Sequence, residues 1–159
     1  MRWWLTTMAL TMTAGGAHAA TVIRPLAESG YWSTVEQVPA ASAAPNSCMI
    51  VQADTAVALR SIGGVVDLMV ANAHWDLPRL MQAAIHVTLS DGAISFPVTF
   101  TTRDTAVAQI GASALPSLLD GMSHDGYMRV VLFPGMPVLV PLAGFAGALP
   151  AFRHCAGLT

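Results

Sequence analysis

Histidines and acids are the residues of this chain most suited to a metal or catalytic site, and two such pairs lie close together in the sequence. His74 is followed by Asp76, and His124 by Asp125. No two histidines have the i, i+4 spacing that makes a zinc signal specific. The sequence therefore predicts no metal and no cofactor. It leaves open, as an alternative function, a small-ligand-binding or hydrolytic periplasmic domain that uses His74, Asp76 or His124.

Motifs for nucleophilic or nucleotide chemistry are missing from the sequence. The chain contains no lysine, which excludes Schiff-base chemistry and a phosphate-loop lysine. It has no G-x-S-x-G motif, and Ser113 in "GASAL" is better explained as a helix cap. Its nine acids are spread along the chain, so no pair of carboxylates is expected to converge in a cleft. We expect no catalytic residues and a protein that is not an enzyme.

The first residues of the chain predict export. Arg2 precedes an uncharged and mostly apolar run, and residues 17–19 (Ala-His-Ala) have the small-x-small form that signal peptidase accepts. The glycine pair at 15–16 ends the apolar run well short of the roughly 20 residues that a membrane span needs. We therefore expect a cleaved signal peptide over residues 1–19, with an uncleaved membrane anchor as the alternative.

Cysteine usage agrees with an exported chain. Cys48 and Cys155 are the two cysteines of the sequence. Because an exported chain meets an oxidising compartment, the economical prediction is one disulfide joining them, with two buried free thiols as the alternative. Residues 20–159 have the length of one domain. We expect a single β-rich domain, closed by one disulfide and not membrane-spanning after cleavage, in the periplasm or at the cell surface.

The charge balance of the chain argues against a nucleic-acid partner. The formal net charge is −2, and the chain has no run of basic residues. Nucleic-acid binding depends on clustered cations that neutralise phosphates. We therefore expect no nucleic-acid partner. The expected partner is a protein, because the sequence has no convergent catalytic set and its aromatic residues could make contacts; the sequence does not give the oligomeric state.

A β-hairpin over residues 83–100, "AAIHVTLSDGAISFPVTF", is the clearest local prediction. Asp91 and Gly92 would form the centre of a type I′ turn, which needs two residues with positive φ. With that loop Leu89 would pair with Ile94, and the large apolar side chains of both strands would share one face.

Further strands are indicated by short apolar runs. We expect them over residues 31–38, 48–54, 65–75, 127–133 and 136–142. The buried face of the third run is ambiguous. Residues 39–47 should form a loop, and Pro134-Gly135 a type II turn. In the last run Pro137 and Pro141 share strand parity, as an edge strand tolerates.

Two segments change to helical spacing. Residues 112–122 do so with Ser113 as the expected cap and Pro116 in the first turn. The tail over 142–155 follows, and Pro150 predicts a late start or a break there. The expected fold is mainly β: an antiparallel β-sandwich-like domain with two short helices, one of them C-terminal.

Trp32 and Trp75 are the residues with the strongest claim to partner contact. Tryptophan is enriched at contact surfaces, although in a small domain its large side chain more often packs against the core. Both roles stay open for the two residues.

The order of these features is also informative. Trp32 lies in an early strand, Cys48 follows a loop, a helix precedes the last hairpin, and Gly144 opens the tail "GFAGALPAFRHC" that carries Cys155. Over residues 31–155 this order resembles the invasion-associated locus B proteins and related small exported domains of alphaproteobacteria. The resemblance implies a compact β-rich periplasmic or surface domain without established catalysis, engaging an envelope or host partner.

The chain departs from that pattern in having no lysine, a proline inside the tail helix and a single cysteine pair. With no convergent catalytic set in the sequence, the expected function is that of an exported, non-enzymatic domain. It would act through protein contacts in the cell envelope or at the cell surface.

Overall fold

The structure, a computed structural model, describes residues 21–40, 46–77, 83–100, 102–132 and 137–158. These residues form ten strands and two helices. In chain order they are β1 (Thr21–Ser29), β2 (Trp32–Pro39), β3 (Ser47–Gln52), β4 (Val57–Ile62), β5 (Val65–Ala71), β6 (Ala83–Leu89), β7 (Gly92–Phe100), β8 (Thr105–Ile110), α1 (Leu115–His124), β9 (Tyr127–Val131), β10 (Pro137–Pro141) and α2 (Phe145–Ala156). The mainly β fold with two short helices, the second at the C-terminal end, is confirmed.

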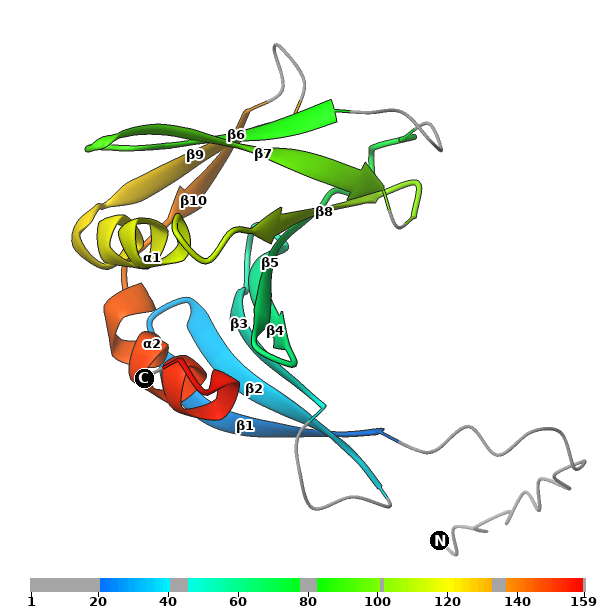
Figure 1. The fold of residues 1–159 in the computed structure, drawn as a ribbon, viewed down its shortest axis with the longest axis vertical. Coiled ribbons are helices and arrows are strands. Elements are labelled where there is room, and N and C mark those ends of the chain that lie inside the picture. The colour runs from blue at the N-terminus through cyan, green and yellow to red at the C-terminus, as the bar shows by residue number, and fades with distance from the viewer. Residues whose placement is uncertain (1–20, 41–45, 78–82, 101, 133–136, 159) are drawn as a thin grey trace, which may run out of the picture.

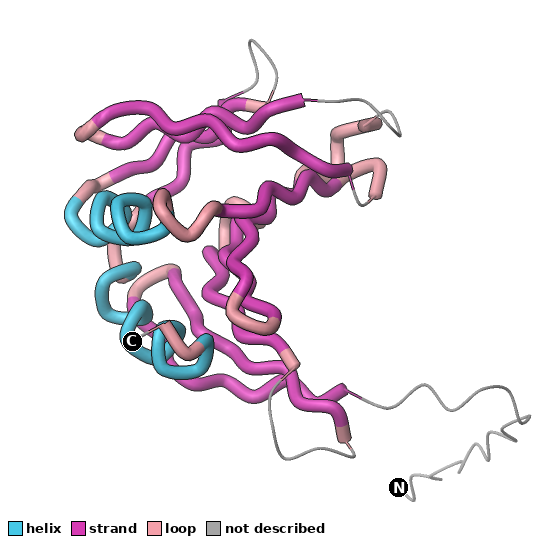
Figure 2. The backbone as a smooth tube through the Cα atoms, viewed as in Figure 1, coloured by secondary structure: helices cyan, strands magenta, loops and turns pink. Residues whose placement is uncertain are grey.

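All ten strands belong to one antiparallel sheet, in the order β1-β2-β3-β4-β5-β8-β7-β6-β9-β10. The sheet curves so strongly that its β1–β2 end faces β6 and β7 across the interior, as the layers of a sandwich face each other (Figure 1). The two helices lie on the open side of this curve, between the ends of the sheet (Figure 2). The order leaves β1 and β10 as the two edge strands.

The core lies on the concave face of the sheet. One row of paired residues crosses five neighbouring strands there, and each of its members is buried: Ile50, Leu59, Leu68, Ala108 and Val98. This row settles the ambiguous strand β5, which buries its even-numbered apolar residues. Both helices complete the same core with fully buried side chains, among them Met122 of α1 and Phe152 of α2.

Trp32 at the start of β2 contacts the end of β10 and the start of α2. The indole Nε1 of Trp32 donates to the Pro141 carbonyl oxygen over 3.0 Å, and its ring meets that of Phe145 edge to face with 4.9 Å between centroids. Gly144 precedes α2 with φ of +96°, and a Cβ there would lie 2.0 Å from the Ser29 carbonyl oxygen. Only glycine allows this close approach of the two backbones.

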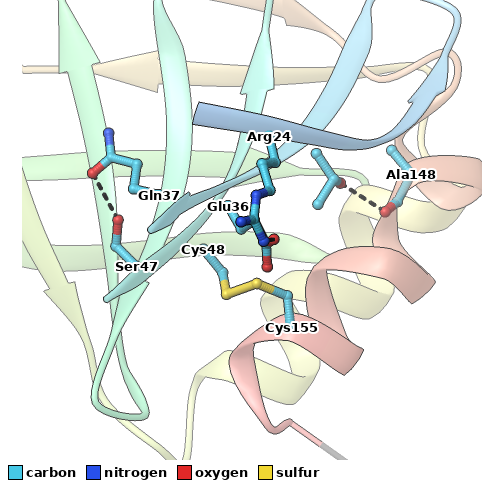
Figure 3. Close-up of a disulfide and its surroundings, with 8 residues drawn as sticks. Arg24, Glu36, Gln37, Ser47, Cys48, Ala148 and Cys155 are labelled. Carbon is cyan, nitrogen blue, oxygen red and sulfur yellow. Dashed lines mark hydrogen bonds and ion pairs between the residues drawn. A yellow bond between two sulfur atoms is a disulfide. The ribbon is translucent and has the colours of Figure 1, made fainter. Parts of the chain in front are cut away.

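A disulfide fixes α2 to the sheet. Cys48 of β3 and Cys155 of α2 are joined, with 5.9 Å between their Cα atoms and a sequence separation of 107 (Figure 3). The ion pair between Arg24 and Glu36, 3.4 Å long, lies beside this bond (Figure 3). The disulfide predicted from the sequence is therefore present in the structure.

Strands β6 and β7 form the predicted hairpin, but its predicted turn and register are wrong. Leu89 pairs with Gly92, so the loop is Ser90-Asp91, and Asp91 does not have the positive φ of a type I′ turn. The Asp125 carboxylate explains the difference, because it accepts hydrogen bonds from both the backbone N–H and the hydroxyl of Ser90. A shift of two residues keeps every side chain on its face, so the predicted apolar face is correct.

Two expectations about the helices are also wrong. Ala114, not Ser113, is the N-cap residue of α1, and no side chain caps the helix, although Pro116 lies in the first turn as predicted. Helix α2 continues through Pro150 without a break. The proline removes one hydrogen bond to the Ala146 carbonyl, and because both residues are exposed, water can solvate that oxygen.

Strands β1, β4 and β8 were not predicted from the sequence. Strand β10 is an edge strand, as its prolines indicated. The signal peptide over 1–19, most of the loop over 39–47 and the Pro134-Gly135 turn lie outside the described residues.

Candidate functional site

The structure does not bring the candidate histidines and acids together. In the loop after β5, the His74 backbone N–H donates to Asn72, and Asp76 forms an exposed ion pair with Arg103, 3.7 Å long. His124 ends α1, where its Nδ1 lies 2.9 Å from a carbonyl oxygen of its own helix. The loop after β5 and helix α1 lie on opposite sides of the molecule (Figure 1). His124 is therefore not placed to act on the same substrate as His74 and Asp76.

In the part of the chain that the structure describes, no cluster of three or more histidine, cysteine, aspartate or glutamate side chains is arranged to hold a metal ion.

Both candidate tryptophans belong to the core. Trp32 is 0% exposed, and its indole N–H donates a hydrogen bond to the Pro141 carbonyl oxygen. Trp75 is 8% exposed, and its buried indole N–H has no partner among the described residues. Neither ring presents a surface to a protein partner.

The exposed apolar side chains are concentrated elsewhere. Among the described residues the large ones are Val22, Ile23, Leu26, Tyr31, Ile62, Val65, Tyr127 and Leu139. Half of this set lies on β1 or in the turn that follows it. An exposed group of apolar side chains on one element marks a contact surface more than single scattered ones do.

Strand β1 presents this group on an open edge of the sheet. It pairs with β2 along one side, with a register shift between Pro25 and Ala27, and no described strand pairs with its other side. Its first six residues are all exposed. An edge of this kind displays a row of unpaired backbone N–H and C=O groups.

The opposite edge of the sheet is better protected against strand addition. Strand β10 has five residues, and both Pro137 and Pro141, at its ends, lack a backbone donor. Strand β1 has nine residues and one proline. At its C-terminal end β1 is covered by α2, since Ser29 lies against Gly147. The first part of β1 is thus the most open edge in the described sheet.

Two carboxyl groups have shifted pKa values, and both support turns. Hydrogen bonds from the Ser90 hydroxyl and N–H lower the pKa of Asp125 below its ordinary value. Those from the hydroxyls of Thr102 and Thr105 lower the pKa of Asp104 in the same way. Both carboxylates accept hydrogen bonds from loop residues, so the lowered pKa values follow from contacts that hold these loops in place.

The β1 edge was missed in the sequence because its residues show no buried face. Pro25 and the lack of a regular apolar–polar alternation over residues 21–29 gave no strand signal, and exposure on an edge depends on which strands pair.

Neither helix, nor any other in the described residues, has the length and apolar character to cross a membrane. The chain matches no protein-family model, no curated protein and no solved structure.

Proposed function

We propose that this chain is an exported, non-enzymatic domain that acts through protein contacts in the cell envelope or at the cell surface, and that β1 is its contact strand. The exposed apolar edge of the sheet is the observation that carries the proposal. Proteins commonly recognise an extended segment of a partner by adding it as a further strand to such an edge.

Strand addition would use the backbone for affinity and the apolar side chains for selectivity. A partner strand alongside β1 would cover Val22, Ile23 and Leu26, which are 46%, 63% and 42% exposed. Full burial of one such side chain contributes roughly 1.5–3 kcal/mol, so the part still exposed on each is worth about 1 kcal/mol. New backbone hydrogen bonds would pair the unpaired N–H and C=O groups of the β1 edge. Binding of this kind needs no catalytic group.

Export is part of the proposal and has three supports. The disulfide between Cys48 and Cys155 is of the kind that persists in oxidising compartments. The expected signal peptide over 1–19 would, once removed, leave β1 next to the new N-terminus. The third support is the resemblance in sequence to the invasion-associated locus B proteins, which is carried by Trp32, Cys48, Gly144 and Cys155.

Two matched charge variants test the contact strand. Ile23 on β1 and Leu139 on β10 are 63% and 60% exposed, so lysine at either site costs the fold equally little. Lysine on an edge strand opposes pairing with another strand. The experiment captures partners from envelope fractions with wild-type protein, Ile23→Lys and Leu139→Lys, and quantifies them by mass spectrometry.

The expected result is a partner retained by wild-type protein and Leu139→Lys and lost by Ile23→Lys. A partner held equally by all three proteins would show that contact occurs elsewhere. Size-exclusion chromatography accompanies the capture, and a homodimer that Ile23→Lys dissociates would assign the edge to a second copy of this chain, contradicting the proposed partner.

A further inference from the structure

A groove of about 480 Å³ opens on the side of the molecule where the two helices meet the sheet. It lies between the start of β5, the end of β8, the start of α1 and the end of α2, which come from distant parts of the chain (Figure 1). Its walls are mostly apolar and include Val65, Val66, Ile110, Leu115, Leu119 and Leu158. A volume of about 300–1,000 Å³ with apolar walls is typical of a site for one small molecule.

Arg153 supplies the only charge among the residues that line the groove. The arginine ion pairs in the described residues use Arg24, Arg60 and Arg103, which leaves the Arg153 guanidinium without a carboxylate partner there. The amide of Gln109 is the one other polar side chain in the lining. An apolar groove with an unpaired cation at its rim complements an apolar ligand with one negative charge.

Two of the residues that line the groove, Gly64 and Gly111, have no side chain to fill it. A Cβ on Gly64 or Gly111 would meet no atom within 4 Å. Beside them, the first turn of α1 has no acidic residue and no side-chain cap, so the positive end of the helix dipole adds to the potential of Arg153.

We propose that this groove binds a free straight-chain fatty acid, with the acyl chain along the apolar walls and the carboxylate on Arg153. The planar guanidinium can hold both carboxylate oxygens at once, which is its preferred geometry with this group. The volume accommodates one acyl chain rather than a lipid with two. The groove is separate from the β1 edge, so ligand binding here is a further activity and does not depend on the protein contact.

Arg153 also has a structural role that a test must separate from ligand binding. It lies in the last turn of α2, where a cation stabilises the negative end of a helix. Loss of that role alone would lower the melting temperature slightly and would leave the affinity for a carboxylate unchanged.

Calorimetric titration near neutral pH with decanoate, and with decanol as its uncharged analogue, tests the proposal on the full folded protein. Wild-type protein should bind decanoate more tightly than decanol. Arg153→Gln should weaken decanoate binding about 10- to 100-fold, the range expected for a hydrogen-bonded charge, and should make the two ligands equal. Arg129→Gln, an exposed arginine on β9 outside the lining, is the matched control and should bind as wild type does.

Gly111→Leu provides a second variant. Its φ is not positive and the space around it is open, so leucine should fit without strain, fill the groove and abolish the binding of both ligands. The proposal is overturned if wild-type protein binds no decanoate, if decanol binds as tightly, or if Arg153→Gln binds decanoate as wild type does. Ile23→Lys should bind decanoate normally, so failure here is distinguishable from failure of the contact strand.

Discussion

Removing the disulfide should cost this protein a large part of its stability. The bond between Cys48 and Cys155 closes a loop of 107 residues. In the chain-entropy description, a loop of that length restricts the unfolded chain by about 16 cal/mol/K, which is about 5 kcal/mol at 25 °C. Engineered and native bridges often deliver less than this relation predicts, so the double variant Cys48→Ala/Cys155→Ala should lose about 3–5 kcal/mol. Small domains have only about 5–15 kcal/mol in total.

Urea unfolding followed by the fluorescence of Trp32 and Trp75 measures this loss, because both rings leave the core on unfolding. Three samples are compared: oxidised wild type, wild type in reductant, and the double alanine variant. The last two should agree within about 1 kcal/mol, and both should unfold with a steeper denaturant dependence, since their unfolded chains are less compact. A loss below about 1 kcal/mol, or equal stability of oxidised and reduced wild type, would refute the reasoning.

Two other substitutions probe single contacts of the fold. Gly144→Ala places a Cβ 2.0 Å from the Ser29 oxygen, at φ of +96°, and should destabilise by at least about 3 kcal/mol in denaturant unfolding, whereas Gly157→Ala, at φ of +67° with open space, should cost about 1–2 kcal/mol; equal costs would contradict the contact. Hydrogen bonds from Ser90 lower the pKa of Asp125 in the folded protein. The ionised Asp125 carboxylate therefore stabilises the fold fully at pH values above its ordinary pKa of 3.8, and this stabilisation is lost as the pH falls through the lower folded pKa. The stability difference between wild type and Asp125→Asn should therefore close in acid, and a difference independent of pH would exclude this role.

Local patterns were enough to predict much of the fold. Apolar residues at helical spacing indicated both helices, and alternation indicated the β6–β7 hairpin and its buried face. Patterns failed where a distant residue decides the geometry. The turn at Ser90 is set by Asp125, thirty-five positions away, which no local signal contains. Strand β8 was missed because its two small alanines give weak alternation, although both are fully buried.

The contact strand and the groove were beyond sequence reasoning for a related cause. Exposure of Ile23 follows from the position of β1 at the edge, which is a property of the strand order. The groove is lined by residues near 65, 110 and 153, which lie far apart in the sequence. Its shape and the lack of a carboxylate partner for Arg153 depend on how these segments pack, so neither could be predicted from the sequence. The disulfide was predictable because only one pairing of two cysteines exists.

Site-specific photo-crosslinking in living cells tests the contact strand most directly. A photoreactive residue is placed at position 23 on β1 or, as the matched control, at position 139 on β10, and the cross-linked products are identified by mass spectrometry. Crosslinks from position 23 to a different exported or surface protein, with none from position 139, are the predicted result. Products that are the same from both positions, or that contain only a second copy of this chain, would contradict it.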